Sequence, residues 1–443
     1  MNILYGTYIL ITSGLVLTCF PFFWLYTRFS GRYGERLKER LGYISRGVTR
    51  SLIGSPRIWI HAVSLGEIKV AESIINSLRN IMPDCSIMLS TTTEHGRDLA
   101  NDTFCDRVPV IYAPIDFIAS VRKALNNIHP DVLVFLETEI WPVWINEARR
   151  MGVKIALVNG RISLRSFKTY FMFRPFFRSV LGNIDRFSMI TEEDRIRIVS
   201  IGADPRKIVV NGNAKYDLLT DLAEPSIEQE MRKALNLEDS RPVLIAGSTR
   251  TGEEPMIIYA YKRIIKEFPD TVLLIAPRHI DRTGEIASLL ERHNLRYQLR
   301  TEIDSDTVKR TEQVVIINRF GELFKLYSIG TIIFCGASLV PLGGQNPLEA
   351  AAWGKAIFYG PHMDDFLDAK ALLDANDSGI QVSSPEMLAE KAISLLRAPD
   401  LLKNYGARAR ETVLRNRNAG ERHARVISEL ISGNLKRSLS YGD

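Results

Sequence analysis

The sequence predicts an α/β protein built from two Rossmann-like domains in series. Short apolar, β-branched runs alternate with stretches of helical spacing, one polar stretch interrupts the alternation, and the alternation then restarts. Such alternation favours parallel sheets with helices on both faces. A chain of 443 residues with 46% hydrophobic and 24% charged residues is long enough for two such cores.

The predicted strands fall into two groups. The first group comprises Arg57–Val63, Ser86–Thr91, Val108–Ala113, Asp131–Leu136, Lys154–Asn159, Phe187–Thr191 and Lys207–Asn211. The second group comprises Val243–Ala246, Thr271–Ala276, Val314–Ile317, Thr331–Cys335 and Ala356–Tyr359. We therefore expect a first domain over 28–216, an interdomain region over 217–240 and a second domain over 241–410. A C-terminal helix and tail over 411–443 follow. The last helical stretch, Pro399 to Ile431, is basic and can pack back across the first domain.

Residues 1–27 contain no charged side chain. As a helix they would be about 40 Å long, enough for a hydrocarbon core of about 30 Å. They lack the positive start and cleavage site of a secretory signal, and they end in aromatic residues followed by an arginine-rich stretch. We expect a membrane-anchoring helix with the rest of the chain in the cytoplasm. A buried apolar helix is the alternative, and Pro21 leaves open whether the segment spans or only embeds.

The net charge indicates which partners to expect, and the cysteines bear on disulfides and metal sites. A net charge of +6 favours acidic partners such as anionic lipids, phosphorylated metabolites or nucleic acid. The four cysteines are scattered through apolar runs, which indicates buried thiols rather than a disulfide framework or a zinc site.

Open parallel sheets bind ligands beyond the carboxyl ends of their strands. Two such domains are expected to face a central cleft, so the loops after the strands are the candidate site. In WIHAVSLGE, Glu67 falls at the start of a helix, where the helix dipole is expected to lower its pKa and keep it ionised as a general base. A helix-capping glutamate is the alternative.

Two further loops of the first domain carry charge. Glu137 and Glu139 alternate after a strand, so one can face the cleft while the other caps the helix that Pro142 begins. Lys215 stands beside a glycine turn and can pair with a phosphate or a carboxylate, although a solvated lysine is equally consistent.

Three loops of the second domain suit anions. Ser248 lies among small residues before a helix, Arg278 and His279 follow a long strand, and a glycine turn runs into another helix. That turn contains Gly343, Gly344, Asn346 and Glu349, with Pro347 expected at the first helical position. The acidic pair Asp304 and Asp306 is interpreted as a surface loop, so we expect no metal.

The segment from Arg161 to Arg178 holds five basic residues, no acidic residue and six aromatic residues. This composition suits a membrane interface and a phosphorylated acceptor, and it is equally consistent with a core-facing helix whose cations reach solvent.

With these residues in hand, the chain resembles the 3-deoxy-D-manno-octulosonic acid (Kdo) transferases of lipopolysaccharide synthesis. The resemblance covers nearly the whole chain and rests on ordered blocks: WIHAVSLGE, STTTEHGRDLA, FLETEIWP, LVNGRISLRS, GNAKYD, GSTRTGEE, APRH and SLVPLGGQNPLEAAAWGKAIFYGPH. Leu65, Gln345 and Ala350 depart from the usual valine, histidine and proline. Gln345 puts any role of that histidine in doubt here.

The resemblance implies a GT-B fold and a metal-independent inverting transfer without a cofactor. It implies CMP-Kdo as donor, a lipid A precursor (lipid IVA) as acceptor and a location at the cytoplasmic side of the inner membrane, in contact with membrane lipids and without nucleic acid. Glu67 becomes the catalytic base, with Glu139 and Lys215 in the acceptor-binding cleft of the first domain. The CMP-Kdo side comprises Ser248, Arg278, His279, Gly343, Gly344, Asn346 and Glu349.

The rival interpretations are a GT-B transferase that uses a UDP-sugar, an epimerase on the same double fold, and a basic membrane-bound binding module. A Kdo transferase differs from a UDP-sugar transferase in needing a cation for the Kdo carboxylate beyond those for the phosphate. An epimerase transfers no sugar to an acceptor. A binding module does not depend on the carboxylate of Glu67.

Overall fold

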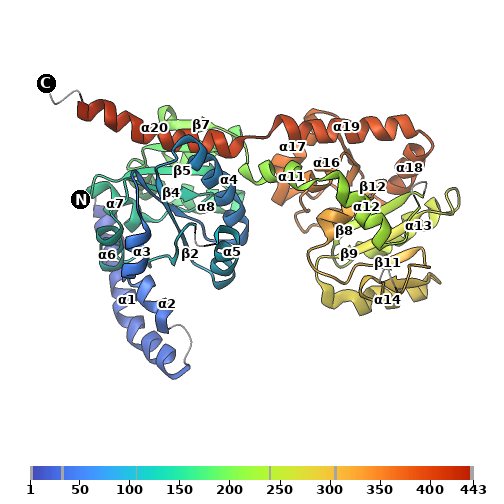
Figure 1. Ribbon diagram of the computed structural model, residues 1–443, viewed down its shortest axis with the longest axis horizontal. Coiled ribbons are helices and arrows are strands. Elements are labelled where there is room, and N and C mark those ends of the chain that lie inside the picture. Colours follow the sequence, from blue (N-terminus) through green and yellow to red (C-terminus); the bar gives the residue numbers. More distant parts are fainter. Residues whose placement is uncertain (1–2, 31–33, 106, 239–240, 304–306, 440–443) are drawn as a thin grey trace. The chain divides into compact units, whose positions relative to one another are not determined.

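The computed structural model describes residues 3–30, 34–105, 107–238, 241–303 and 307–439 (Figure 1). The chain divides into two compact units. Unit 1 comprises Met1–Asp217 together with Asn418–Asp443, and unit 2 comprises Leu218–Arg417. Each unit contains one parallel sheet with helices packed on it, which confirms the predicted pair of α/β domains.

The sheet of unit 1 has seven strands in the order β3-β2-β1-β4-β5-β6-β7, and all its pairings are parallel. The chain order reverses between β1 and β4, which makes their carboxyl ends the topological switch point where such sheets bind ligands. The strands are β1 (Arg57–His61), β2 (Ser86–Thr91), β3 (Val110–Tyr112), β4 (Val132–Leu136), β5 (Lys154–Gly160), β6 (Arg186–Met189) and β7 (Ile208–Val210).

Alternation along each strand builds two cores in unit 1. In β4, Leu133 and Phe135 join the core on one face, whereas Val132, Val134 and Leu136 join the core on the other. All five side chains are buried, so the strand reads as a continuous apolar run although its residues serve two faces. All seven strands predicted for this unit are confirmed, with every end within two residues of its predicted position.

The helices of unit 1 cover both faces of its sheet (Figure 1). The last of them, α20, belongs to unit 1 although it follows the whole of unit 2, and it packs against α4 through buried Ala424 and Ile427. The helices are α1 (Ile3–Ser30), α2 (Gly34–Arg40), α3 (Arg46–Ser51), α4 (Leu65–Ile81), α5 (Glu94–Phe104), α6 (Ile118–Ile128), α7 (Pro142–Arg150), α8 (Leu164–Met172), α9 (Arg174–Leu181), α10 (Glu192–Ile201) and α20 (Ala419–Leu439); short 3-10 helices are η1 (Pro205–Lys207) and η2 (Ala214–Tyr216).

The helix expected over residues 1–27 is present as α1. It is joined to the rest of unit 1 by the Tyr8 hydroxyl, which donates to Asp116 (2.9 Å), and by contact of the Tyr8 ring with Phe176. In contrast to the membrane-anchoring helix expected there, the described residues include no helix that is both long and apolar enough to cross a membrane.

The sheet of unit 2 also has seven strands, all parallel, in the order β10-β11-β9-β8-β12-β13-β14. Its switch point lies between β8 and β12. The two outermost strands, β10 and β14, were missed by the sequence analysis because each has only three residues and a weak apolar pattern. The strands are β8 (Val243–Thr249), β9 (Val272–Pro277), β10 (Tyr297–Leu299), β11 (Val314–Ile316), β12 (Ile332–Cys335), β13 (Ala356–Tyr359) and β14 (Gly379–Gln381).

Two helices occupy the region expected between the domains. They are α11 (Asp217–Leu222) and α12 (Pro225–Ala234), and α12 packs with unit 2 against α15. The remaining helices of unit 2 are α13 (Glu254–Ile264), α14 (Thr283–Arg292), α15 (Leu323–Tyr327), α16 (Leu348–Ala352), α17 (Leu367–Ala375), α18 (Pro385–Leu396) and α19 (Pro399–Arg415), with η3 (Ile280–Arg282), η4 (Arg300–Glu302) and η5 (Asp364–Phe366). The basic stretch at the end of the chain is thus divided between α19 of unit 2 and α20 of unit 1.

Candidate active site

Glu67 lies at the carboxyl edge of the unit 1 sheet, on the first turn of α4. Ser64 is the N-cap of that helix, and its hydroxyl accepts from the Glu67 amide (3.4 Å). The Glu67 carboxylate accepts from the Val63 amide (2.8 Å) and from the Ser64 hydroxyl (3.0 Å). This arrangement resembles a capping box, so residues close in sequence are enough to hold the carboxylate in place.

The prediction that the helix dipole lowers the pKa of Glu67 is wrong. Burial raises the pKa of Glu67 to about 7, the Val63 amide and Ser64 hydroxyl lower it, and the charges of Glu137 and Glu139 raise it further. A helix dipole contributes about 0.3–1 kcal/mol, less than one pKa unit, whereas burial can shift a carboxyl by about 3–5 units. The carboxyl is therefore suited to exchanging a proton near neutral pH.

Lys215 pairs with Glu137 at the end of β4. Its Nζ lies 2.6 Å from Glu137 Oε1, and a Cβ added at Gly66 would lie 3.4 Å from the same nitrogen. The lysine is therefore beside the turn that carries Glu67. Glu137 has a φ of +53°, in the left-handed region, which turns the chain sharply where the strand ends. The strand ends at Leu136, so the two glutamates do not alternate between faces of the sheet, and the charges of both act on Glu67.

Glu139 accepts a hydrogen bond from the Trp141 indole nitrogen (2.5 Å). Burial raises its pKa, the Trp141 hydrogen bond lowers it, and the charge of Glu137 raises it. Neither glutamate caps α7. That role belongs to Asp116, which accepts from the Val143 amide (3.0 Å) and the Trp144 amide (3.1 Å). Asp116 is distant in sequence, so no local signal identified it.

The donor-side candidates of unit 2 follow three adjacent central strands. Ser248 lies at the end of β8, Arg278 and His279 follow β9, and the glycine turn follows β12. Because all three strands are parallel, these loops emerge at one edge of the sheet. Arg278 is exposed, and within the described chain its guanidinium has no hydrogen bond or ion pair. It is thus available for an anion.

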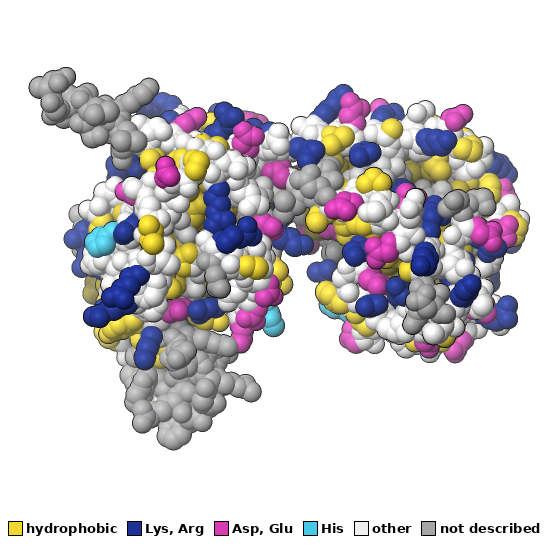
Figure 2. Space-filling model, in the orientation of Figure 1, with side chains coloured by type: hydrophobic (Ala, Val, Ile, Leu, Met, Phe, Trp, Pro, Cys, Tyr) yellow, Lys and Arg dark blue, Asp and Glu magenta, His cyan; other side chains and the backbone are white. Residues whose placement is uncertain are grey.

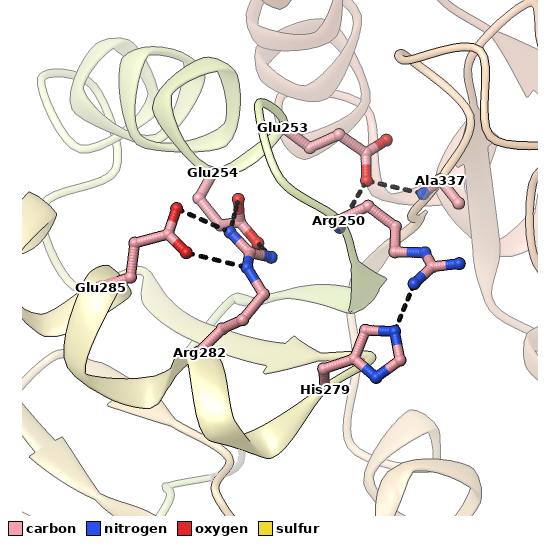
Figure 3. Close-up of polar contacts among 7 residues, drawn as sticks. All are labelled: Arg250, Glu253, Glu254, His279, Arg282, Glu285 and Ala337. Carbon is pink, nitrogen blue, oxygen red and sulfur yellow. Dashed lines mark hydrogen bonds and ion pairs between the residues drawn. The ribbon is translucent and has the colours of Figure 1, made fainter.

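Figure 3 shows the side chains of Arg250 and His279 pointing toward each other from neighbouring strand ends. Arg250 Nη1 donates to His279 Nε2, so that ring nitrogen carries no proton. Beside them, the buried Thr249 hydroxyl has no partner among the described residues. Arg250, His279 and Thr249 therefore form a cluster of polar side chains to which an anionic ligand can add the missing hydrogen bonds.

Glu253 connects two loops at this edge of the sheet by hydrogen bonds. Its buried carboxylate accepts four backbone amides, those of Arg250 (3.0 Å), Ala337 (2.6 Å), Ser338 (2.9 Å) and Leu339 (3.1 Å). It therefore ties the loop after β8 to the loop after β12 (Figure 3). Glu253 lies in the GSTRTGEE block, but no local pattern indicates this role, because three of its four partners lie more than eighty residues away.

The glycine turn after β12 lies as expected, but the helix after it differs. Gly343 has a φ of +86°, and an added Cβ would lie 2.3 Å from an Asp365 carboxylate oxygen, so only glycine fits. Pro347 is the N-cap of α16 rather than its first residue, and the Asn346 side chain accepts the Leu348 amide (3.1 Å). The charge of Glu349 adds to burial in raising the pKa of the Cys335 thiol, which places Glu349 beside the end of β12.

The two remaining predictions concern the basic aromatic segment over 161–178 and the acidic pair Asp304 and Asp306. The core-facing interpretation of the basic aromatic segment is confirmed for the rings of α8 and α9 that pack on the core, whereas Phe171, Met172 and Phe173 are exposed. Its contact with a membrane stays a prediction. Figure 2 shows lysine and arginine side chains in several groups on the visible face of unit 1. The pair Asp304 and Asp306 lies outside the described residues, and the described part of the chain has no group of three or more acidic, histidine or cysteine side chains arranged to hold a metal.

The comparisons with known proteins agree with this architecture. A glycosyltransferase structure from Rickettsia africae has a TM-score of 0.61 at 17% identity, covering 85% of this chain and 99% of that one. A UDP-GlcNAc 2-epimerase structure from Neisseria meningitidis has a TM-score of 0.61 at 15% identity, covering 85% and 100%. The two doubly wound units define a fold of the GT-B class, which transferases and epimerases share.

The sequence comparisons distinguish within that class. A family model described as 3-deoxy-D-manno-octulosonic-acid transferase (kdotransferase) matches residues 35–218. Proteins named 3-deoxy-D-manno-octulosonic acid transferase match at 29% identity from Haemophilus influenzae (96% of this chain, 99% of that protein) and 31% from Rickettsia felis (84% and 79%). The chain belongs to the Kdo transferase family of glycosyltransferases. It also spans 51% of a bifunctional glycosyltransferase/methyltransferase from Fusobacterium nucleatum, at 36% identity over 74% of this chain.

Proposed function

We propose that the protein transfers Kdo from CMP-Kdo to a lipid A precursor, lipid IVA, by a metal-independent inverting displacement with Glu67 as general base. Family membership supports the sugar and the reaction class. The observation that carries the mechanism is the buried Glu67 carboxyl with a pKa of about 7 at the carboxyl edge of the unit 1 sheet. A base acts most effectively when its pKa lies near the working pH.

In the proposed step, the Glu67 carboxylate takes the proton of an acceptor hydroxyl. The hydroxyl oxygen forms a bond to the anomeric carbon of Kdo, and the bond from that carbon to the phosphate oxygen breaks on the opposite face. CMP leaves with the bonding electron pair and carries the developing negative charge. Lys215 supplies a cation beside Glu67, which suits the Kdo carboxylate or the acceptor phosphate.

Unit 2 is assigned to the donor. The exposed guanidinium of Arg278 and the neighbouring Arg250–His279 pair offer positive charge and hydrogen-bond donors to the CMP phosphate. The Gly343–Asn346 turn is assigned to the same phosphate, with the Gly344 amide already donating to the Ala337 carbonyl (2.8 Å). Preorganised donors of this kind stabilise charge that develops on a leaving group. Ser248 and Glu349 complete the set, with Glu349 assigned to the ribose hydroxyls.

The acceptor is a lipid, and the surface of unit 1 supports a location at the cytoplasmic face of the inner membrane. Exposed apolar side chains lie on α1, among them Leu10, Ile11, Leu15 and Phe22. The exposed Phe171, Met172 and Phe173 follow the basic residues of α8. Apolar and basic side chains together favour contact with anionic lipid headgroups.

The deciding experiment measures CMP release from CMP-Kdo in the presence of a tetra-acylated lipid A precursor, without added metal and with chelator, and follows the lipid by mass. A lipid that gains one or more Kdo units supports the proposal and counts the transfers. CMP release without a heavier lipid means hydrolysis or another acceptor, and no CMP release from folded protein favours a UDP-sugar donor. Glu67→Gln is expected to slow transfer by about 10²–10⁴-fold, while Glu72→Gln, on the same helix, retains it.

Donor assignment has its own test. Arg278→Ala is expected to raise the KM for CMP-Kdo and weaken CMP binding measured by calorimetry. Arg296→Ala removes an arginine from an exposed position (87% exposed) of the same unit and serves as the matched control. Equal CMP affinity in both variants would remove Arg278 from the donor site.

A further inference from the structure

The loop that carries Lys215 begins at the edge of the unit 1 sheet, three strands away from the strand that precedes its partner Glu137. The loop that carries it follows β7, an edge strand, whereas its partner Glu137 follows β4. Three strand spacings of about 4.8 Å separate these strands, so the loop must return across roughly 14 Å of the carboxyl edge. A loop keeps one conformation over such a distance only where specific hydrogen bonds attach it to the rest of the domain.

One of these attachments comes from a buried residue of the C-terminal helix, His423. It is completely buried and contacts the ends of three adjacent strands. Its Nε2 lies 3.1 Å from the Gly212 carbonyl, after β7. Its Nδ1 lies 2.7 Å from the Ser188 hydroxyl in β6 and 3.5 Å from the Asn159 amide in β5.

These partners determine the protonation of the ring. A carbonyl only accepts and a backbone amide only donates, so Nε2 carries the proton and Nδ1 accepts. Ser188 then donates to Nδ1 and accepts from the Asn211 side chain (2.7 Å). Every polar atom of the imidazole is satisfied by the neutral ring, in a fully buried position where an unmade hydrogen bond is costly.

The same helix holds the loop on both sides of Lys215. Before the lysine, Arg422 Nε donates to the Asn211 carbonyl (2.9 Å). After it, the Asp217 carboxylate accepts the Ala419 amide (3.0 Å) and the Gly420 amide (2.6 Å). Gly212 has a φ of +86°, which lets the chain turn beneath Arg422.

The segment between these attachments is also ordered. The Asn159 side chain accepts the Ala214 amide (2.9 Å), and the Asn213 side chain accepts the Lys215 amide (3.1 Å). Asn159, whose φ is +50°, thus touches both the histidine and the lysine loop. Hydrogen bonds within unit 1 thus connect His423 to the backbone that precedes Lys215, at Gly212 directly and at Ala214 through Asn159.

We propose that His423 is a positioning residue for the transfer reaction: from the C-terminal helix it fixes the loop that presents Lys215 beside Glu67. This inference rests on the proposed function, because it gives Lys215 a part in the reaction. It makes α20 an integral part of the acceptor-side site, although His423 touches no reacting atom.

The experiment compares three variants of the full chain. His423→Leu removes all three hydrogen bonds, and His423→Gln keeps a donor that can reach the Gly212 carbonyl. Ile427→Val alters a buried residue of α20 that makes none of these hydrogen bonds. We expect about a ten- to hundredfold loss of kcat for His423→Leu, since a displacement of about 1 Å can cost that much. Gln is expected to recover most of the loss, and Ile427→Val to retain wild-type kcat.

Hydrogen exchange supplies a readout that does not depend on activity. Faster exchange of the amides of Ala214, Lys215 and Tyr216 is expected in His423→Leu and not in Ile427→Val. If His423→Leu fails to fold, Ser188→Ala is measured in its place, which removes the hydroxyl that donates to Nδ1 and accepts from the Asn211 side chain. Unchanged exchange at these amides in a folded variant would overturn the inference.

A double-mutant cycle separates positioning from general stability. If His423 acts through Lys215, His423→Leu lowers kcat little further in a Lys215→Ala background. Full multiplication of the two losses would mean a merely structural role and would overturn the inference. Wild-type kcat in Lys215→Ala would instead refute the proposed function of the lysine, while the exchange result would still report on the loop.

Discussion

The Lys215 ammonium lies 2.6 Å from the Glu137 carboxylate, across a part of unit 1 where three carboxyl groups converge. Glu137 is 15% exposed and Lys215 is 32% exposed, so the pair is only partly screened by water. This ion pair joins a lysine from an edge-strand loop to Glu137, and the first prediction concerns its contribution to stability.

Lys215→Met should destabilise unit 1, because it leaves Glu137 largely buried without its cation. A loss of about 1–3 kcal/mol is expected, between the values for exposed and buried pairs. Four of the five tryptophans lie in unit 1, so their fluorescence during urea unfolding reports mainly on this unit. Adding Glu137→Gln should recover much of the loss, and simple additivity of the two changes would show that the pair contributes nothing. Asp204→Asn at a solvent-exposed pair serves as the control.

The pH dependence of the reaction should report the pKa of Glu67. Because burial raises that pKa to about 7, the carboxyl is protonated below pH 7 and cannot accept a proton there. We expect kcat/KM to rise with pH to a plateau with a midpoint near 7. Glu67→Gln should lower kcat by about 10²–10⁴-fold and remove the rising limb. Glu137→Gln should move the midpoint to lower pH, since the charge of Glu137 raises this pKa. A rising limb that survives in Glu67→Gln would assign the base elsewhere.

Unit 1 should lose stability in mild acid because of His423. Burial lowers its pKa to about 4, with a smaller lowering by Arg422, opposed by the hydrogen bond to Gly212. The unfolded histidine has a pKa of about 6.5, so between these values the unfolded state binds more protons and stability falls as pH falls. The contribution is fully present above about pH 6.5 and is about 2 kcal/mol smaller at pH 5.

The measurement is urea unfolding followed by tryptophan fluorescence at pH 7 and pH 5, in wild type and His423→Gln. The glutamine variant should lose about 2 kcal/mol of this pH dependence. Buried His61, whose pKa is lowered to about 3 by burial, remains in both proteins and cancels in the comparison. The same pH dependence in both proteins would mean that His423 does not titrate in this way.

Glu253→Gln should weaken unit 2 and its donor site together. The carboxylate accepts four backbone amides, and an amide side chain would present its own N–H groups to some of them. Loss of charge-assisted bonds in a buried site predicts a destabilisation of about 2–4 kcal/mol. Thermal unfolding with and without CMP should show a lower midpoint and a smaller shift by CMP. Glu285→Gln, which removes a partly exposed partner of Arg282, is the control and should leave the CMP shift intact.

The sequence by itself determined the elements that local pattern controls. The buried strands of both sheets follow from runs such as Val132–Leu136, because period-two side chains on a parallel strand must be apolar on both faces. The position of Glu67 follows from the Ser64 cap three residues before it. The placement of Arg278 and Gly343 at one edge follows from parallel strands. The ordered blocks around these residues also predicted the Kdo transferase family, which the comparisons confirm.

Tertiary structure decided everything that depends on distant residues. Burial by other elements reverses the expected direction of the Glu67 pKa, and Asp116 rather than a local glutamate caps α7. Lys215 meets Glu137 from a loop that is hydrogen-bonded to α20, some two hundred residues later in the chain. Short edge strands such as β14 owe their existence to a neighbour rather than to their own pattern. Hydrogen bonds and desolvation depend on which groups the fold brings together, and that information is not local in the sequence.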